Sequence, residues 1–382
     1  MKNIFSKIKL FKAKEKFSFG LDIGTQSIKC VKLKISGDDV ELVGFEVEDG
    51  QIDPREALKK IKHAQGADLV NISFCGASTI IRYVNFLRMS KNELAGALKF
   101  EAQKLIPFSV EEVNLDAEIL KDDLPENKML VLIAAIKKEI ISQRIGVLEN
   151  VGLRVNLVDI DSLALVNAFN FNYAKLEVAE NKTASAPVSS SNQNPKPQGA
   201  GLVSPNQSPK PQGTGLASSS QSPKSICLLN IGAGITNVNI LDNGIVRLSR
   251  DIHFGGANFT KKLMDIFEID FKSAEELKIN PPEDKLAKTK ASVESLFTNL
   301  ASEIRTSFDY YESQNISSVA KIYLSGGASK MPGLKEMLGA CLGLPVETWD
   351  PFKQVRIPDT INRQELDKFY GQFNVAVGLA LR

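Results

Sequence analysis

Two short stretches of this sequence combine glycines with residue types that bind anions and metal ions. In the first, "LDIGTQSIKCVKL" (21–33), an apolar run ends in a carboxylate, a glycine, hydroxyls and a lysine. A glycine at a strand turn lets backbone N–H groups approach an anion closely, and the carboxylate suits a Mg²⁺ ion with its waters. The pattern therefore predicts a phosphate-binding turn. Its candidate residues are Asp22, Gly24, Thr25, Gln26, Ser27 and Lys29.

The second stretch, "LNIGAGITNVNIL" (229–241), repeats the first at an offset of 208 residues. Its candidate residues are Asn230, Gly232, Gly234 and Thr236. A further strand follows each stretch, and Asp242-Asn243-Gly244 is a strong hairpin-turn signal. A duplicated α/β core explains this self-similarity. An ordinary hairpin also explains either glycine turn alone, whereas two turns facing each other would clamp one polyphosphate.

Two more segments fit the recognition of a nucleoside. In "IYLSGGASKMPGLKEML" (322–338), a strand ends in Gly326-Gly327, where a flat base and its ribose can lie against the backbone. In "SAEELK" (273–278), Glu275 and Lys278 lie three residues apart on one helical face and are placed to share the hydroxyls of a ribose. On its own, such a pair is more commonly a solvated surface ion pair, and the nucleoside interpretation depends on the neighbouring motifs.

These residues need strands and helices to position them, and both kinds of element are visible in the sequence. The segment 92–108 places Leu94, Leu98, Ala102 and Leu105 on one helical face, and Pro107 ends it. Further helices are predicted over 137–153 and 293–311, and the strands "RVNLVDI" and "KIYLSGG" follow helical segments. The fold class is therefore α/β with mixed layers.

Composition excludes several classes of protein. The chain has 382 residues, a formal net charge of +2 and only two histidines, so neither a nucleic-acid-binding field nor histidine-based catalysis is indicated. The four cysteines are scattered without a CxxC pair, which is typical of a reduced cytosolic protein. The longest strongly apolar run, 129–136, is too short to span a bilayer. We expect a cytoplasmic location.

Two segments have biased composition. Residues 180–224 are rich in Ser, Pro, Gln, Asn, Lys and Gly, and "PKPQGAGL" recurs there as "PKPQGTGL", which predicts a disordered insertion between two ordered blocks. Residues 1–16 hold six lysines and one glutamate with apolar residues near one helical face. They are either a weak membrane-surface helix or a frayed basic tail.

The order of phosphate turn, second phosphate turn, ExxK and Gly-Gly turn resembles the actin-like ATPase superfamily. Within it, the chain resembles the PilM family of type IV pilus assembly proteins, through segments such as "GLDIGTQSIKCVKL", "LIPFSVEEVNLDAEIL" and the closing "VAVGLALR". This resemblance implies a two-lobed actin-like fold with ATP and Mg²⁺ in the cleft, Asp22 holding the metal through water and Asn230 contributing weakly.

The resemblance also implies a domain organisation and partners. The first lobe would carry a small inserted subdomain that docks the N-terminal cytoplasmic tail of a PilN-type inner-membrane protein. The protein would then lie in the cytoplasm, peripheral to the inner membrane, and self-associate into a ring. The implied boundaries are a basic tail (1–16), a first lobe (17–179) with the subdomain at about 86–158, the insertion (180–224), a second lobe (225–350), and a return to the first lobe with a C-terminal helix (351–382).

The sequence suggests where the tail would dock. In "LIPFSVEEVNLDAEIL" (105–120), Ile106 and Phe108 lie beside a helix end, and a strand with alternating apolar positions follows, including Val113 and Leu115. An extended peptide commonly adds to a sheet edge and fills pockets with its apolar side chains. We expect these four residues to contact the tail, although each is also a plausible core residue.

One residue departs from the superfamily pattern. The second phosphate turn usually begins with Asp, and here it begins with Asn230, an amide that lacks the negative charge. ATP binding is compatible with this change, but hydrolysis is expected to be weak at most, and no catalytic base is identified. Two alternatives stay open from the sequence: an FtsA-like cell-division protein, and a sugar or acetate kinase of the same superfold.

Overall fold

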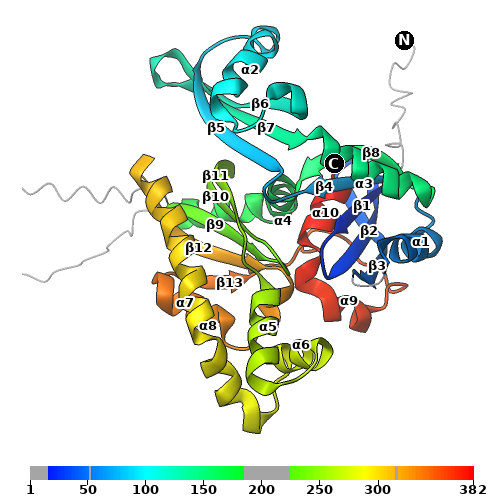
Figure 1. Cartoon of the computed structure of the whole chain (residues 1–382). Helices are drawn as coiled ribbons and strands as arrows, with labels where there is room; N and C mark the ends of the chain where they lie inside the picture. The colour runs from blue at the N-terminus through cyan, green and yellow to red at the C-terminus, as the bar shows by residue number, and fades with distance from the viewer. Residues whose placement is uncertain (1–15, 51–52, 185–223, 315–316) are drawn as a thin grey trace, which may run out of the picture.

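The computed structural model describes residues 16–50, 53–184, 224–314 and 317–382. The basic tail up to residue 15 and nearly all of the predicted disordered insertion lie outside these ranges. Two five-stranded sheets form two lobes, and a smaller three-stranded sheet stands beside the first lobe (Figure 1).

The first sheet has the strand order β3-β2-β1-β4-β8. Strands β1 (Lys16–Ile23), β2 (Ser27–Ser36) and β3 (Asp39–Asp49) form an antiparallel meander, while β4 (Leu69–Phe74) and β8 (Arg154–Ile160) add to β1 in parallel. Helices α1 (Pro54–Gln65) and α3 (Lys138–Asn150) cover one face, where Ile61 and Leu148 join the core of this lobe.

The second sheet repeats this topology with the order β11-β10-β9-β12-β13. Strands β9 (Lys224–Ile231), β10 (Thr236–Asp242) and β11 (Ile245–Ile252) form the meander, and β12 (Ser318–Ser325) and β13 (Val346–Thr348) are parallel to β9. Asn243 and Gly244 both have positive φ, as the predicted two-residue hairpin turn requires. The repeated topology confirms the duplicated core.

Helices of the second lobe cover its sheet and supply a large apolar core. They are α5 (Gly256–Phe267), α6 (Phe271–Ile279), α7 (Glu283–Gln314) and α8 (Leu334–Leu342). Phe297, Ile304 and Phe308 of α7 are buried against the sheet, as the helical spacing of these apolar residues predicts.

The three-stranded sheet has the order β5-β7-β6 and is covered by a helix. It consists of β5 (Thr79–Leu87), α2 (Lys91–Leu105), β6 (Val113–Leu124) and β7 (Lys128–Lys137). The expected subdomain, about 86–158, differs from this unit at both ends. At its start, the subdomain includes all of β5, because β5 pairs with β7 along its full length. At its end, the subdomain excludes β8, because β8 pairs with β4 of the first lobe.

The chain ends on the first lobe, after α9 (Arg363–Phe369), with α10 (Asn374–Ala380). Helix α10 lies against β1 and against α4 (Asp161–Ala184), the long helix that starts at the end of β8. Two glycines permit this packing: a Cβ on Gly378 would lie 1.8 Å from the carbonyl oxygen of Ala164, and one on Gly20 would lie 1.9 Å from that of Ala376.

Candidate functional site

The two glycine turns have the same geometry and face each other between the lobes. The Gly24 N–H donates to the Ser27 carbonyl at 3.1 Å, and the Gly232 N–H donates to the Ile235 carbonyl at 2.9 Å. A Cβ on Gly234 would lie 3.8 Å from the Thr25 hydroxyl oxygen. The two turns therefore lie close together where the lobes meet, and this region is called the cleft below.

Both turns present donors towards this cleft. Within the described residues, no hydrogen-bond partner occupies the backbone N–H groups of Thr25, Gln26, Ala233 and Gly234. Lys29 lies directly beneath the first turn, its Nζ 3.4 Å from the Cβ position of Gly24. Clustered N–H groups beside a lysine are suited to an anion such as a polyphosphate.

The residues at the ends of β1 and β9 occupy equivalent positions but carry different charges. Asp22 is paired across the sheet with Lys29, and their side chains form a buried ion pair of 2.9 Å. At the equivalent positions, 208 residues later, the Asn230 amide donates to the Asn237 side-chain oxygen at 2.8 Å. A neutral amide pair thus replaces an ion pair, so the change at Asn230 is matched by one at its cross-strand partner.

A chain of hydrogen bonds leads from Asn237 to the first lobe. Asn237 donates to Asp251 Oδ1 at 2.8 Å, and the other carboxylate oxygen of Asp251 accepts the Gly76 N–H at 2.6 Å. Gly76 follows β4, so Asp251 of the second lobe holds a loop of the first lobe. The Asn230 side-chain oxygen accepts a longer bond, 3.3 Å, from Ser325.

Asp161, which the sequence analysis did not identify, is a third carboxylate of the cleft. It follows β8 and begins α4, and Ser73 and Cys75 hydrogen-bond to it. Burial and the nearby charges of Asp22 and Asp251 raise the pKa of Asp161 to about 6. The sequence does carry a signal for Asp161, because ligand-binding residues often follow the carboxyl ends of parallel strands.

Two further groups complete the surroundings of Asp161. Arg144 of α3 lies near Asp161 and Asp22, and burial lowers the pKa of this guanidinium. Burial raises the pKa of the Cys75 thiol, with the charge of Asp161 acting in the same direction. The first-lobe side of the cleft holds Asp22, Asp161, Lys29 and Arg144.

The structure places the other predicted nucleotide residues around the second turn. Gly326 has a φ of 94°, and a Cβ there would lie 2.3 Å from the Ile231 carbonyl, directly beside the end of β9. Gly327 begins a short 3₁₀ turn next to Gln372. Thr236 does not face the cleft: it is fully buried, and its hydroxyl donates to the Phe254 carbonyl.

Glu275 and Lys278 form an ion pair of 2.6 Å, as their spacing predicts, but the pair is not a solvated surface contact. Lys278 is buried, and its ammonium also reaches Thr260 at 2.8 Å and the Gly256 carbonyl at 3.4 Å. The Gly256 N–H in turn donates to the Gly232 carbonyl. Lys278 therefore supports the second turn through α5, and the partly exposed Glu275 is the better placed of the two to contact a ribose.

A metal ion in this cleft would need ligands beyond the protein. Among the residues that the structure describes, no group of three or more His, Cys, Asp or Glu side chains is arranged to hold an ion. Mg²⁺ usually binds one or two carboxylates, phosphate oxygens and waters. Asp22 and Asp161 fit that mode, whereas Asn230 adds only a neutral oxygen that Ser325 already contacts.

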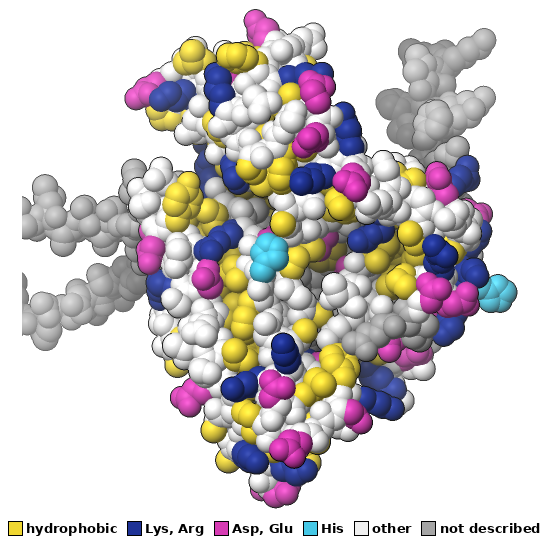
Figure 2. Space-filling view, viewed as in Figure 1, with side chains coloured by type: hydrophobic (Ala, Val, Ile, Leu, Met, Phe, Trp, Pro, Cys, Tyr) yellow, Lys and Arg dark blue, Asp and Glu magenta, His cyan; other side chains and the backbone are white. Residues whose placement is uncertain are grey.

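A second candidate site is a cavity of about 300 Å³ between the small subdomain and the first lobe. Two edge strands border it: β6 through the consecutive residues 114–118 and β8 through 157–160. In the space-filling view, hydrophobic side chains gather among charged ones where the subdomain meets the lobes (Figure 2). The remaining lining residues are Leu132, Ala134, Ile136, Ile141, Leu163 and Arg382.

The residues expected to contact a partner lie partly elsewhere. Ile106 and Val113 are buried together with Ala135 in a small core cluster of the subdomain. Phe108 is half-buried beside the same cluster, where the Lys137 ammonium lies 4.5 Å from its ring centroid. Of the four predicted residues, Leu115 lines the cavity. The neighbouring edge of β6 is therefore the accessible part of this region.

Within the described ranges, every helix is either too short or too polar to cross a lipid bilayer.

Comparison with known proteins identifies the family. The family model described as type IV pilus assembly protein PilM matches residues 20–190 and 214–382. A solved structure described as a PilM–PilN type IV pilus biogenesis complex is similar over 96% of this chain and 98% of that chain, with a TM-score of 0.74 and 22% identity.

A second solved structure, the ethanolamine utilization protein EutJ from Carboxydothermus hydrogenoformans, matches over 96% of this chain and 89% of its own, with a TM-score of 0.49 and 13% identity.

The similarity to the PilM–PilN structure and the repeated sheet topology confirm the two-lobed actin-like fold. The family match favours pilus assembly over the cell-division and kinase alternatives, because it covers both lobes. This chain therefore belongs to the PilM family of type IV pilus assembly proteins.

Proposed function

We propose that this protein is a nucleotide-binding scaffold of the type IV pilus machine that docks the N-terminal cytoplasmic tail of a PilN-type inner-membrane protein. Membership of the pilus assembly family supports the cellular role. The similar solved structure is named as a complex with PilN, which supports the partner. The observation that carries the docking proposal is the cavity between two free edge strands.

The docking mode follows from this geometry. Strands β6 and β8 each end their sheets, so each has a row of backbone groups without a neighbouring strand in the described residues. An extended tail would add hydrogen bonds to one of these edges and insert apolar side chains between Ala134, Leu157 and Leu163. The tail would thereby connect the subdomain to the first lobe.

In the other site, we propose that the two turns hold ATP with Mg²⁺. The N–H groups of the turns and the Lys29 charge would bind the phosphates, and Asp22 and Asp161 would hold the ion through its waters. The ion supplies charge neutralisation for the phosphates when bound. Because Asn230 and Asn237 form a neutral pair, we expect slow hydrolysis at most.

Location and assembly complete the proposal. The protein would lie in the cytoplasm, peripheral to the inner membrane, because the docked tail belongs to a membrane protein. Self-association into a ring beneath the machine remains a prediction from the family resemblance.

Titration calorimetry with a synthetic peptide of the PilN-type tail tests the docking site. Leu157→Glu replaces an apolar lining side chain by a carboxylate that the bound tail would have to desolvate, and it should weaken binding at least about tenfold. Leu87→Glu is the matched control, because Leu87 is 66% exposed and does not line the cavity. Binding that is absent in the wild type, or equal in Leu157→Glu, would refute the proposal.

ATP binding has its own test. Asp22→Asn keeps the shape of the side chain and removes its charge, so the affinity for ATP in the presence of Mg²⁺ should fall by roughly 1–3 kcal/mol. The same titration with EDTA in place of Mg²⁺ should show little difference between the two proteins. Equal affinities with Mg²⁺ would mean that Asp22 serves only its ion pair with Lys29.

A further inference from the structure

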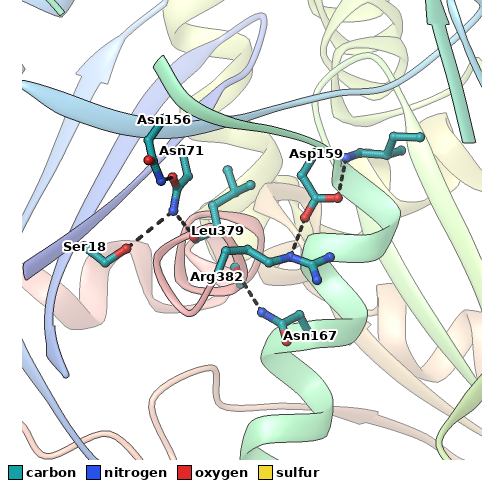
Figure 3. Close-up of polar contacts among 9 residues, drawn as sticks. Ser18, Asn71, Asn156, Asp159, Asn167, Leu379 and Arg382 are labelled. Atoms are coloured by element: carbon teal, nitrogen blue, oxygen red, sulfur yellow. Dashed lines mark hydrogen bonds and ion pairs between the residues drawn. The ribbon is translucent and has the colours of Figure 1, made fainter. Parts of the chain in front are cut away.

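The end of α10 is held in place by three asparagines (Figure 3). Asn71 donates to the Leu379 carbonyl at 2.8 Å, and Asn167 donates to the Gly378 carbonyl at 2.9 Å. Asn156 donates to the Asn71 side-chain oxygen at 2.8 Å, which orients that amide. The Leu379 carbonyl also accepts backbone N–H groups of Leu381 and Arg382, so these side-chain bonds add to the backbone bonds of the last turn. Side chains of β4, β8 and α4 therefore fix the position of the helix end.

Arg382 follows this fixed helix end and reaches the cavity. Its Nε donates to Asp159 Oδ2 at 2.7 Å, while Asp159 Oδ1 accepts the N–H of Ile160 (Figure 3). Asp159 is almost fully buried, with 7% of its side chain exposed, whereas the Arg382 side chain is 33% exposed. Both residues line the cavity.

The bond between them leaves most of the guanidinium available. A guanidinium has five N–H donors, and the ion pair with Asp159 uses the one on Nε. Within the described residues, the two terminal nitrogens of Arg382 have no hydrogen-bond partner. A fixed arginine with unused donors at the wall of a cavity is suited to binding an acceptor that enters it.

The charges of the cavity decide which acceptor fits. Among the described residues that line the cavity, Arg382 is the one cationic side chain, whereas Asp116, Glu118 and Asp159 are acidic. A carboxylate entering here would be repelled by Asp116 and Glu118. A main-chain carbonyl carries no net charge, and an extended peptide lying along β6 or β8 presents one at every residue.

We propose that Arg382 donates a hydrogen bond to a main-chain carbonyl of the docked tail, and that Asp159 positions its guanidinium to do so. This inference rests on the proposed docking function. This hydrogen bond would determine the register of the tail. One carbonyl of the tail has to lie within hydrogen-bonding distance of the guanidinium while the apolar side chains of the tail fill the cavity.

Calorimetry with the synthetic tail peptide tests the assignment on the full chain. Arg382→Met should weaken binding about tenfold to a hundredfold, the usual effect of losing a charge-assisted hydrogen bond. Asp159→Asn keeps one oxygen, which can accept from Arg382 Nε at the expense of the bond from the Ile160 N–H, and it leaves the terminal donors in place, so binding should weaken at most about threefold. Melting temperatures of both variants show whether α10 has loosened.

Peptides with one backbone amide replaced by an ester identify the carbonyl, because an ester carbonyl is a poorer acceptor. One ester position should weaken wild-type binding and have no further effect on Arg382→Met, while the other positions affect both proteins alike. Equal losses in Arg382→Met and Asp159→Asn, or identical ester profiles, would overturn the inference and indicate a purely structural ion pair. Absence of wild-type binding would instead refute the docking function.

Discussion

Asp22 and Lys29 face each other across β1 and β2, and Asn230 and Asn237 face each other at the equivalent positions of the second lobe. The first pair is ionic and the second is a pair of amides. The Asn237 amide group donates to Asp251, and its oxygen accepts from Asn230, so its orientation is fixed by a carboxylate on one side and an amide donor on the other. The neutral turn is thus a property of three residues together.

This coupling predicts that restoring the usual aspartate alone will harm the protein. In Asn230→Asp, two carboxylates would compete for the Asn237 amide, and we expect a loss of roughly 1–3 kcal/mol in the free energy of unfolding. The double variant Asn230→Asp with Asn237→Lys recreates the pair of the first lobe and should recover most of this loss. Chemical denaturation measures both. A stable single variant would show that Asn237 does not constrain position 230.

The carboxylates of the cleft make stability depend on pH. The pKa of Asp161 rises from 3.8 to about 6 in the folded protein, chiefly through burial. Between these values the native state keeps a proton that the unfolded chain releases, so the free energy of unfolding falls as the pH rises through this range. Asp161→Asn removes the titrating group and should raise the melting temperature more at about pH 7.5 than at about pH 4.5.

The control is Asp265→Asn, which removes one charge from an exposed position of α5. Its effect on the melting temperature should be the same at both pH values. If Asp161→Asn behaves identically, the carboxylate of Asp161 is not destabilised by its surroundings.

Among the elements, α10 depends most clearly on close packing. It is buried between β1 and α4, and Gly378 and Gly20 allow backbone to approach backbone. The same helix ends at the asparagines that orient Arg382. Its position therefore affects both the core of the first lobe and the wall of the cavity.

A methyl group on Gly378 should displace this helix. Gly378→Ala would bring a Cβ within 1.8 Å of the Ala164 carbonyl oxygen, and we expect a destabilisation of about 1–3 kcal/mol or more. Gly96→Ala is the matched control, because Gly96 lies exposed inside α2 with no atom within 4 Å of its Cβ position. That change should be neutral or stabilising. Thermal melts of the two variants that coincide would contradict this packing.

At the scale of the whole molecule, β11 of the second lobe connects the residues beside the second glycine turn to the small subdomain. Asp251 holds the Gly76 N–H at 2.6 Å, just before β5 begins. Two residues earlier on β11, Ser249 hydrogen-bonds the Tyr83 hydroxyl of β5 at 2.9 Å. A ligand that changes the separation of the two lobes must therefore strain or relax these contacts, and with them the subdomain that borders the cavity.

We predict that ATP with Mg²⁺ changes the affinity for the tail peptide, and that Asp251→Ala reduces this effect. Coupling between two sites is typically about 5- to 150-fold, and the variant should lose most of it while keeping its affinity for the peptide alone. Calorimetry with and without saturating nucleotide measures the difference, with Asp265→Asn as the charge control. Undiminished coupling in Asp251→Ala would mean that the lobes communicate by another route.

Sequence alone determined the features that depend on neighbours along the chain. The duplicated turns, the hairpin at Asn243-Gly244 and the buried faces of α2 and α7 follow from glycine conformation and from periodic apolar residues. These are local rules, so they hold before any tertiary contact is known. The order of the motifs carried the family resemblance, and the resemblance in turn implied the two-lobed fold.

Tertiary structure decided which of these residues are available and which distant residues join them. The turn motif pointed to Thr236, whose hydroxyl is buried against Phe254, and did not point to Asp161 or Asp251, which lie far from it in the sequence. Likewise β6 and β8 border one cavity only because β8 pairs with β4 and so ends the first sheet. The order of strands in a sheet, and the burial of a polar side chain such as Thr236, depend on contacts between segments that a local pattern does not specify.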